Sequence, residues 1–259
     1  MNGKAAIFLS VRDKATRLPG KVMRRIHDRR AIEHLIDRIR RSTAADLVVM
    51  TTSIHSGDDG LAAVAEANGI ACFRGSEEDK LTRYLDAADQ FGIEFFTVVD
   101  GDDLFADATF IDQIITDWRK SNGDFIIVDK LPVGGTAFGV RTEAMRKVVE
   151  LKAENDTEVW GGYFTTTGLF NCRFLEPVDE RMARPDLRMT LDYQEDLDFF
   201  TAVFDALYQP GTVFSFASIL ELLVARPDIV ALNQGAQQKY EAGLKKAAPV
   251  RMKPVTSAI

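Results

Sequence analysis

The chain has 259 residues, of which 46% are hydrophobic, and a formal net charge of −7 at pH 7. This composition supplies ample apolar side chains for a globular core, and the negative charge argues against nucleic acid as a partner. No apolar run approaches the roughly 20 residues needed to cross a bilayer, which argues against a membrane protein. A charged segment directly after the first apolar run argues against a signal peptide. The two cysteines indicate no disulfide framework, so a cytoplasmic location is expected.

Strands and helices alternate along the first half. The expected strands are residues 5–11, 46–52, 71–74, 95–99 and 124–128, and the expected helices are residues 31–41, 58–68, 78–91 and 109–120. This alternation predicts an α/β fold with a mainly parallel sheet flanked by helices. Ligands bind at the carboxyl ends of the strands in such sheets. The segments after the strands 5–11 and 95–99 are therefore the first candidates for a site.

The second half is less regular. A strand is expected over 137–140, and helices are expected over 142–152, 194–207, 215–225 and 229–246. Residues 160–170 are aromatic and glycine-rich, and they predict a β-rich excursion that covers a site or pairs with another subunit. Residues 247–259 contain two prolines and predict a loosely ordered tail.

Three cations follow the first strand in one loop. Arg12, Arg17 and Lys21 lie in the segment LSVRDKATRLPGK (residues 9–21), whose Pro-Gly pair predicts a turn. Cations and free backbone N–H groups at a strand end suit a triphosphate. Arg offers bidentate contacts to phosphate oxygens, and Lys offers a compact charge. A basic surface loop is the alternative that three cations alone leave open.

This loop resembles the N-terminal signature R-x-x-S-x-R-L-P-G-K of the cytidylyltransferases that activate 3-deoxy-ulosonic and sialic-type acids. The departure is Ala15, which stands near the usual Ser. The resemblance implies a Rossmann-like nucleotide-diphospho-sugar transferase fold. It also implies CMP transfer from CTP to a sugar-acid hydroxyl, with pyrophosphate release, for surface polysaccharide or glycan synthesis by a homodimer. The nucleotide contacts it implies here are Leu9, Ser10, Arg12, Arg17 and Lys21.

Acidic residues follow the strand 95–99. Asp100, Asp102 and Asp103 would repel one another without a cation nearby. Hard oxygen ligands beside a triphosphate indicate Mg²⁺, and a simple Asp-Gly turn is the alternative. The segment resembles the family's G-D-x-P turn, which implies that Asp102 binds metal and nucleotide. Asp100 is expected at the nucleotide, although relatives often have Gln or Thr there, and Leu104 replaces the usual Pro.

A second acidic segment precedes the helix 194–207. On its own it reads as a helix N-terminus with favourable acids. It also resembles the family's T-x-D-x-x-E-D-L motif, which implies that Asp192 is the second metal ligand. The resemblance thus implies Arg12, Lys21, Asp102 and Asp192 as catalytic residues. Because Lys21 and Asp192 lie at expected strand ends, replacing either is expected to affect activity far more than folding.

Residues 74–84, RGSEEDKLTRY, are similar to the segment R-G-x-x-x-D-V-L-x-R-Y of relatives in the spore-coat-polysaccharide branch. The similarity implies that Arg74 binds nucleotide, with Arg83 as a further cation near base or phosphate. A capped helix with solvated charges is the alternative. Since the resemblance spans nearly the whole chain, we expect a single domain over 1–246. Residues 1–130 would bind nucleotide, and residues 131–246 would bind the acceptor and form a dimer.

The acceptor site is expected in the second half. Trp160 and Tyr163 are candidates because aromatic groups suit a polyol, although core or dimer packing is an equal alternative. Phe164 and residues 165–167 belong to the same candidate segment. Relatives often have R-E-H-V-T nearby, whereas residues 156–160 read DTEVW. The spare cations for an acceptor carboxylate or phosphonate are Arg141, Arg173 and Arg188, and simple solvation at the surface is the default alternative for each.

Three other functions stay open. The first is cytidylyl transfer to a phosphonate, which would use the same donor half. The second is a glycosyltransferase with Asp100-Gly101-Asp102 as a D-x-D metal site. The third is a non-catalytic homologue.

Overall fold

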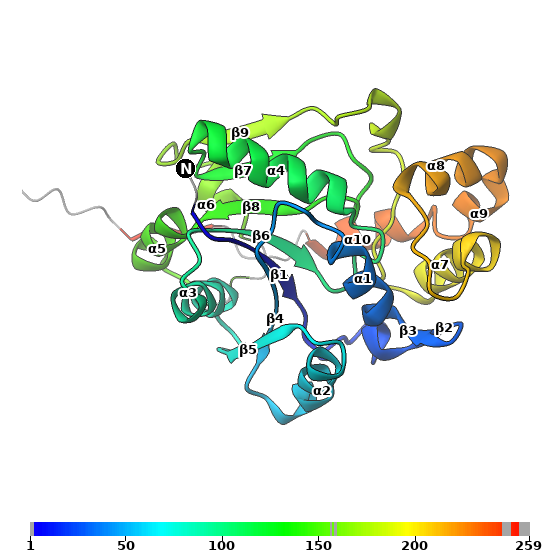
Figure 1. Cartoon of the computed structure of the whole chain (residues 1–259), viewed down its shortest axis with the longest axis horizontal. Coiled ribbons are helices and arrows are strands. Elements are labelled where there is room, and N and C mark those ends of the chain that lie inside the picture. The colour runs from blue at the N-terminus through cyan, green and yellow to red at the C-terminus, as the bar shows by residue number, and fades with distance from the viewer. Residues whose placement is uncertain (1–2, 156, 158–159, 245–249, 254–259) are drawn as a thin grey trace, which may run out of the picture.

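A seven-stranded sheet forms the centre of the computed structural model, which describes residues 3–155, 157, 160–244 and 250–253 (Figure 1). Its strand order is β5-β4-β1-β6-β8-β7-β9, and β8 alone among these runs antiparallel to its neighbours. The expected mainly parallel α/β fold is thereby confirmed. The strands are β1 (Ala5–Ser10), β4 (Leu47–Ser53), β5 (Ala71–Gly75), β6 (Phe95–Asp100), β7 (Phe125–Val128), β8 (Phe138–Arg141) and β9 (Cys172–Leu175).

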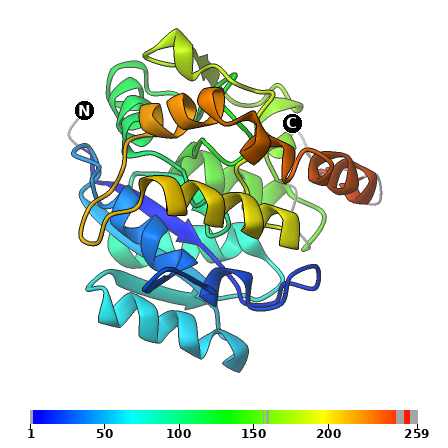
Figure 2. The same ribbon diagram turned by 90° about the vertical axis from the view of Figure 1, so that its right-hand side faces the viewer.

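Helices cover both faces of this sheet. One face is covered by α1 (Ala31–Ile39), α2 (Asp59–Ala67), α4 (Ala108–Ser121), α7 (Gln194–Leu207), α8 (Phe216–Ala225) and α9 (Pro227–Ala231). The other is covered by α3 (Lys80–Phe91), α5 (Thr142–Leu151) and α6 (Gly162–Thr165). Figure 2 shows α7 and α8, in yellow and orange, side by side in front of the sheet. None of the described helices is long and apolar enough to span a membrane.

Short elements complete the chain. They are the 3-10 helices η1 (Lys21–Met23), η2 (Ser56–Asp58) and η3 (Glu180–Met182), the antiparallel pair β2 (Arg25–Ile26) and β3 (Arg29–Arg30), and the terminal helix α10 (Ala236–Leu244).

The central strand β1 is buried on both faces. Ile7 and Leu9 point into the core under α1 and α4, and Ala6 and Phe8 point into the core under α3 and α5. Side chains alternate between the two faces of a strand, so a strand covered on both sides must be apolar throughout. This burial fixes the register of β1 and places its carboxyl end, Ser10, beside the end of β6.

The predicted β-rich excursion over 160–170 was wrong. The segment forms the short helix α6 and a loop, and the strand β9 begins only at Cys172. Trp160, Tyr163 and Phe164 are buried in the core beneath β7 and β8. Their spacing of three and four residues is that of one helix face. These rings therefore pack in the core of the chain.

The expected helix over 229–246 is broken into α9 and α10. The break lies at Asn233, which is buried and donates hydrogen bonds to Asp196 Oδ1 and the Arg188 carbonyl. Its amide thus caps groups elsewhere in the fold. Part of the expected loose tail is ordered, since Lys253 N donates to the Leu151 carbonyl. The rest of the tail lies outside the described residues, as do residues 156, 158 and 159.

His34 makes the stability of the fold depend on pH. Its ring is buried against Phe204 and Tyr208, and Nε2 hydrogen-bonds the Ile26 carbonyl. Burial, with a contribution from Arg29, lowers the pKa of His34 below its usual 6.5. The unfolded chain therefore takes up this proton first as the pH falls, so the contribution of His34 to stability is complete above pH 6.5 and declines below it.

When the pH is lowered from 7 to 5.5, we expect the free energy of unfolding to decrease less in a His34→Gln variant than in the unmodified protein. Gln retains a donor for the Ile26 carbonyl but does not titrate. Urea unfolding at several pH values measures both proteins. Equal pH dependence in the two would contradict the prediction.

Candidate active site

A cavity of about 720 Å³ opens at the carboxyl ends of β1 and β6. Its walls are the loop after β1, the turn after β6, the start of α3, residues 133–138 and the segment before α7. The lining side chains used below are those of Ser10, Arg12, Lys14, Arg17, Lys21, Lys80, Arg83, Asp100, Asp102, Asp103, Thr136, Phe138, Thr190, Asp192, Tyr193 and Tyr240. Most are charged or hydroxylated, which suits a polar, anionic ligand.

Lys21 lies between two carboxylates at the centre of this cavity. Its Nζ is 2.6 Å from Asp102 Oδ2 and 3.0 Å from Asp192 Oδ1. Burial alone would lower the pKa of Lys21, but the attraction of Asp102 and Asp192 outweighs it and raises the pKa. The pKa of Asp192 is lowered because the cations around it outweigh its burial. Lys21 and Asp192 therefore both stay charged at neutral pH.

Local backbone structure explains how these groups meet. Gly20 has φ 65°, in the left-handed region that glycine adopts without strain, and this turn directs Lys21 back over the sheet. Asp102 lies in the turn after β6. Leu191 N donates to the Asp102 carbonyl at 2.9 Å, which brings Asp192 to the same place although the expected strand before it does not form.

Arg17 and Arg188 hold Asp192 through its two different oxygens. Arg17 Nη2 is 3.0 Å from Asp192 Oδ1, and the guanidinium lies 5.4 Å from the ring centres of both Tyr193 and Tyr240. Arg188 Nη2 is 2.9 Å from Asp192 Oδ2. Stacking on two rings restricts the Arg17 side chain. Arg17 therefore lines the cavity with its charge in a defined position.

Arg12 is held by the loop before α3. Its Nη1 donates to the Glu77 carbonyl at 2.5 Å, and Lys14 Nζ pairs with the Glu77 carboxylate at 2.6 Å. The sequence predictions for Arg12, Arg17, Lys21, Asp102 and Asp192 thus converge on one cavity. Asp100 and Ser10 line it as well.

The carboxylates suit a hard cation. Burial, with the neighbouring charges of Asp102 and Asp100, raises the pKa of Asp103 well above its usual range. Such crowding is what a bound cation would relieve. Among the described residues no three His, Cys, Asp or Glu side chains are arranged as a metal site. The chemistry of Asp102 and Asp192 would suit Mg²⁺, which takes one or two carboxylates and keeps waters or phosphate oxygens as its other ligands.

Sequence comparison decides the family. A sequence model described as Cytidylyltransferase matches residues 6–159, more than half of the chain. The chain belongs to the cytidylyltransferase family. It is accordingly a nucleotidyltransferase.

Relatives of this cytidylyltransferase extend along most of its length. The spore coat polysaccharide biosynthesis protein SpsF of Bacillus subtilis is 28% identical over 228 residues, covering 85% of this chain and 94% of SpsF. A cytidylyltransferase structure from Leptospira borgpetersenii has a TM-score of 0.80 at 22% identity, covering 88% of this chain and 97% of that one. CMP:2-keto-3-deoxy-manno-octonic acid synthetase, solved with CTP, has a TM-score of 0.59 at 13% identity, covering 78% and 99%. The structural likeness confirms the Rossmann-like nucleotidyltransferase fold.

Two of the residues expected at the nucleotide lie outside the lining of the cavity. Arg74 pairs with Asp59 and donates to the carbonyls of Ser53 and His55, so it ties β5 to the turn after β4. Leu9 is fully buried in the core. In the described part of the chain, Arg74 thus has a structural role, which it fulfils through its contacts with Asp59, Ser53 and His55.

The expected acceptor residues are also elsewhere. Trp160 and Tyr163 are 5% and 2% exposed and pack in the core under α3 and α5. Arg188 is 6% exposed, and its Nε donates to Asp196 Oδ1 at 3.0 Å. Its place between Asp192 and Asp196 makes it a residue that positions Asp192. The wall offered by the second half consists instead of residues such as Thr136, Phe138 and Tyr240.

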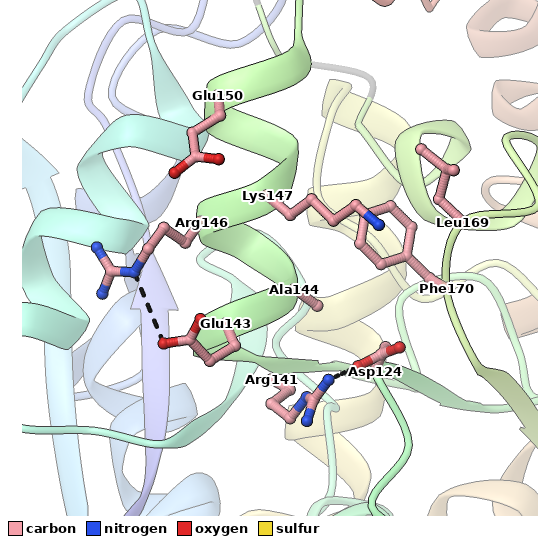
Figure 3. A pocket seen from close by; sticks show the side chains of 9 residues that line it. All are labelled: Asp124, Arg141, Glu143, Ala144, Arg146, Lys147, Glu150, Leu169 and Phe170. Atoms are coloured by element: carbon pink, nitrogen blue, oxygen red, sulfur yellow. Dashed lines mark ion pairs between the residues drawn. The ribbon is translucent and has the colours of Figure 1, made fainter. Parts of the chain in front are cut away.

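The two other spare cations lie far from this cavity. Arg141 ends β8 and pairs in register with Phe95, at the opposite end of β6 from Asp100. A second cavity of about 490 Å³ opens there (Figure 3). Arg141 contacts Asp124 at 2.5 Å, and Arg173 contacts Asp117 at 2.6 Å. Figure 3 also shows Arg146 directed to Glu143, so the charges of this second cavity neutralise one another.

Sequence reasoning missed Lys80. It is the first residue of α3, is 9% exposed and lines the active-site cavity, where its Nζ is 2.9 Å from Asp100 Oδ1. Burial would lower the pKa of Lys80, but the attraction of Asp100 raises it. Lys80 and Arg83 are three residues apart on one helix face, and both line the cavity. That spacing was a usable signal in the sequence.

Proposed function

We propose that this cytidylyltransferase transfers CMP from CTP to a hydroxyl of a sugar acid, of the ulosonic or sialic type, with release of pyrophosphate. The observation that supports this most is the convergence of Arg12, Arg17 and Lys21 with Asp102 and Asp192 in one cavity. Three cations can hold a triphosphate, and two carboxylates can hold its metal. The name of the SpsF relative supports a role in polysaccharide synthesis.

In the proposed reaction the acceptor hydroxyl oxygen forms a bond to the α-phosphorus of CTP. The bond from that phosphorus to the bridging oxygen of the β-phosphate breaks, pyrophosphate leaves, and the hydroxyl proton passes to solvent water. Arg12 and Lys21 would bind phosphate oxygens and stabilise the charge that develops on them. Arg17 would support them from its place on Tyr193 and Tyr240.

Asp102 and Asp192 would hold Mg²⁺, which supplies Lewis-acid charge stabilisation and can lower the pKa of the attacking hydroxyl. The lowered pKa of Asp192 suits it to ligation because it stays ionised. For the same reason Asp192 is a poor general base. The residues of the chain thus mainly orient the triphosphate and balance its charge.

The acceptor would enter over the wall made by Thr136, Phe138, Thr190 and Tyr240. The described residues of the second half contribute no Lys or Arg to this wall. A carboxylate or phosphonate on the acceptor would therefore contact cations of the first half. The same cations could therefore bind either candidate acceptor, a sugar acid or a phosphonate. The homodimer implied by the resemblance stays a prediction.

A pyrophosphate-release screen tests this function. With Mg²⁺ present, CTP, UTP, GTP and ATP are each combined with ulosonic acids, sialic-type acids and simple phosphonates. We expect release with CTP and one acceptor class, and no release when Mg²⁺ is chelated. Release with a phosphonate alone would replace the sugar acid as acceptor.

Consumption of a preformed nucleotide sugar without any nucleoside triphosphate would contradict the proposal and favour a glycosyltransferase. Thermal stabilisation by CTP without release with any acceptor would support a non-catalytic homologue.

A further inference from the structure

Lys80 and Asp100 form an ion pair inside the wall of the active-site cavity. Their side chains are 11% and 31% exposed, and Lys80 Nζ lies 2.9 Å from Asp100 Oδ1. A lysine this buried is uncommon unless it is paired. Because the pair is neutral overall, it adds nothing to the attraction of the cavity for phosphate. Its presence at the cavity calls for another explanation.

The backbone holds both partners in defined positions. Asp79 caps α3 by accepting from Thr82 N, and this fixes the helix end from which Lys80 projects. Asp100 ends β6 and is in register with Ser10, and the next residue, Gly101, donates its N–H to the Ser10 carbonyl at 2.8 Å. The carboxylate is therefore held by the sheet through its backbone and by Lys80 through one oxygen.

The second oxygen of Asp100 is available to a ligand. Within the described part of the chain, Oδ2 accepts no hydrogen bond, whereas Oδ1 is engaged by Lys80. An ionised carboxylate offers about four acceptor sites and no donor. Its natural partner in a polar cavity is a hydroxyl group. Ser10, whose Oγ accepts from Tyr84 at 2.6 Å, places a second hydroxyl group beside it.

Position within the fold favours the ribose of the nucleotide as the source of that hydroxyl. Lys80, Asp100 and Ser10 all belong to the half that bears the triphosphate loop, and Glu77, three residues before Lys80, holds Arg12 through its carbonyl. The site also lies between β1 and β6, where the strand order reverses, and ligands of open α/β sheets bind at such a switch point.

We propose that Asp100, positioned by Lys80, binds a ribose hydroxyl of the nucleotide and makes the site selective for ribonucleotides over deoxyribonucleotides. This inference rests on the proposed function, since it takes the cavity to bind a nucleoside triphosphate. Lys80 is a positioning residue here, because it acts by fixing the Asp100 carboxylate. Without the charge of Lys80, the Asp100 carboxylate would still be present at the end of β6, but its orientation would no longer be fixed by an ion pair.

Calorimetric titration with CTP, 2′-deoxy-CTP and 3′-deoxy-CTP, all with Mg²⁺, tests the proposal. A hydrogen bond to a charged group corresponds to about a 10- to 100-fold change in affinity. We expect the unmodified protein to bind CTP more tightly than at least one deoxy analogue by about that factor. In Asp100→Ala the ratio should fall to within about twofold of unity. Lys80→Met should give an intermediate ratio.

Two further variants distinguish a loss of ribonucleotide selectivity from a loss of folding or of general nucleotide affinity. The double variant Lys80→Met/Asp100→Ala removes both charges, so neither is left buried without a partner, and the protein should fold even if a single variant does not. We expect it to bind CTP and the deoxy analogues with equal affinity. Lys14→Met removes a cation from the same cavity but leaves the Lys80–Asp100 pair intact. It should weaken all three ligands alike and keep their ratio.

The possible results separate the role of Asp100 from the assignment of the nucleotide. Retention of the full ratio in Asp100→Ala or in the double variant would overturn the inference, as would equal binding of CTP and both analogues by the unmodified protein. If another triphosphate binds in place of CTP, the cytidylyl assignment fails, and the same comparison with the deoxy forms of that nucleotide still decides the role of Asp100. If no triphosphate binds, both proposals fail.

Discussion

Replacing Lys21 by Ala is expected to lower the rate of pyrophosphate release by about 10³-fold or more. The Lys21 ammonium is the central cation of the cavity and lies within 3.0 Å of both Asp102 and Asp192. A fixed positive charge in a site that excludes water stabilises phosphate charge far more than the same charge in water does. Steady-state pyrophosphate release at saturating Mg²⁺ measures the effect.

Lys14→Ala is the matched control for this substitution. Lys14 lines the same cavity, but its side chain is 73% exposed and pairs with Glu77. We expect a loss of less than about 10-fold, because an exposed charge is screened by solvent. A comparable loss in both variants would show that only the net charge of the loop matters. Near-normal turnover of Lys21→Ala would overturn its assigned role.

Replacing Asp192 by Asn is expected to reduce both activity and stability. Asp192 is 4% exposed and contacts three cations, Lys21, Arg17 and Arg188. Losing its charge would leave these cations without a shared partner, at a cost of about 3–5 kcal/mol in unfolding free energy. Pyrophosphate release should fall by about 10³-fold, because the proposed metal loses a ligand. Urea unfolding and the release assay measure the two effects.

Glu195→Gln provides the control for Asp192→Asn. Glu195 lies in the first turn of α7, only three residues away, and pairs with Lys239 at the surface. Its replacement should change stability by less than about 0.5 kcal/mol. An Asp192→Asn protein as stable as the unmodified one would contradict the network described here. From its expected place at a strand end, Asp192 was predicted to matter little for folding. The buried ion pairs that it forms with Lys21, Arg17 and Arg188 instead predict a loss of stability when it is replaced.

Motifs with several ordered residues were located well from the sequence. The loop 9–21 and the turn after β6 follow apolar strands, and parallel strands must present their carboxyl ends at one edge of the sheet. The positions of Arg12, Lys21 and Asp102 in the chain are therefore enough to predict that they lie together. For single residues chosen by chemical type alone, such as Trp160 and Arg141, the sequence left a structural role open beside the functional one, because an aromatic ring or a cation fits a core or an ion pair equally well. The structure places Trp160 in the core and pairs Arg141 with Asp124.

The sequence by itself determined the α/β alternation, the buried central strands and the chemistry of the triphosphate loop. These follow from local periodicity and from residues close together in the chain. The motif resemblance placed Asp192 with Asp102, but only the tertiary structure shows the contact that brings them together, a backbone hydrogen bond between residues 191 and 102. The tertiary structure also decided the pairing of Lys80 with Asp100 and the burial of Trp160. Each depends on contacts between distant segments, for which the spacing of residues along one segment carries no information.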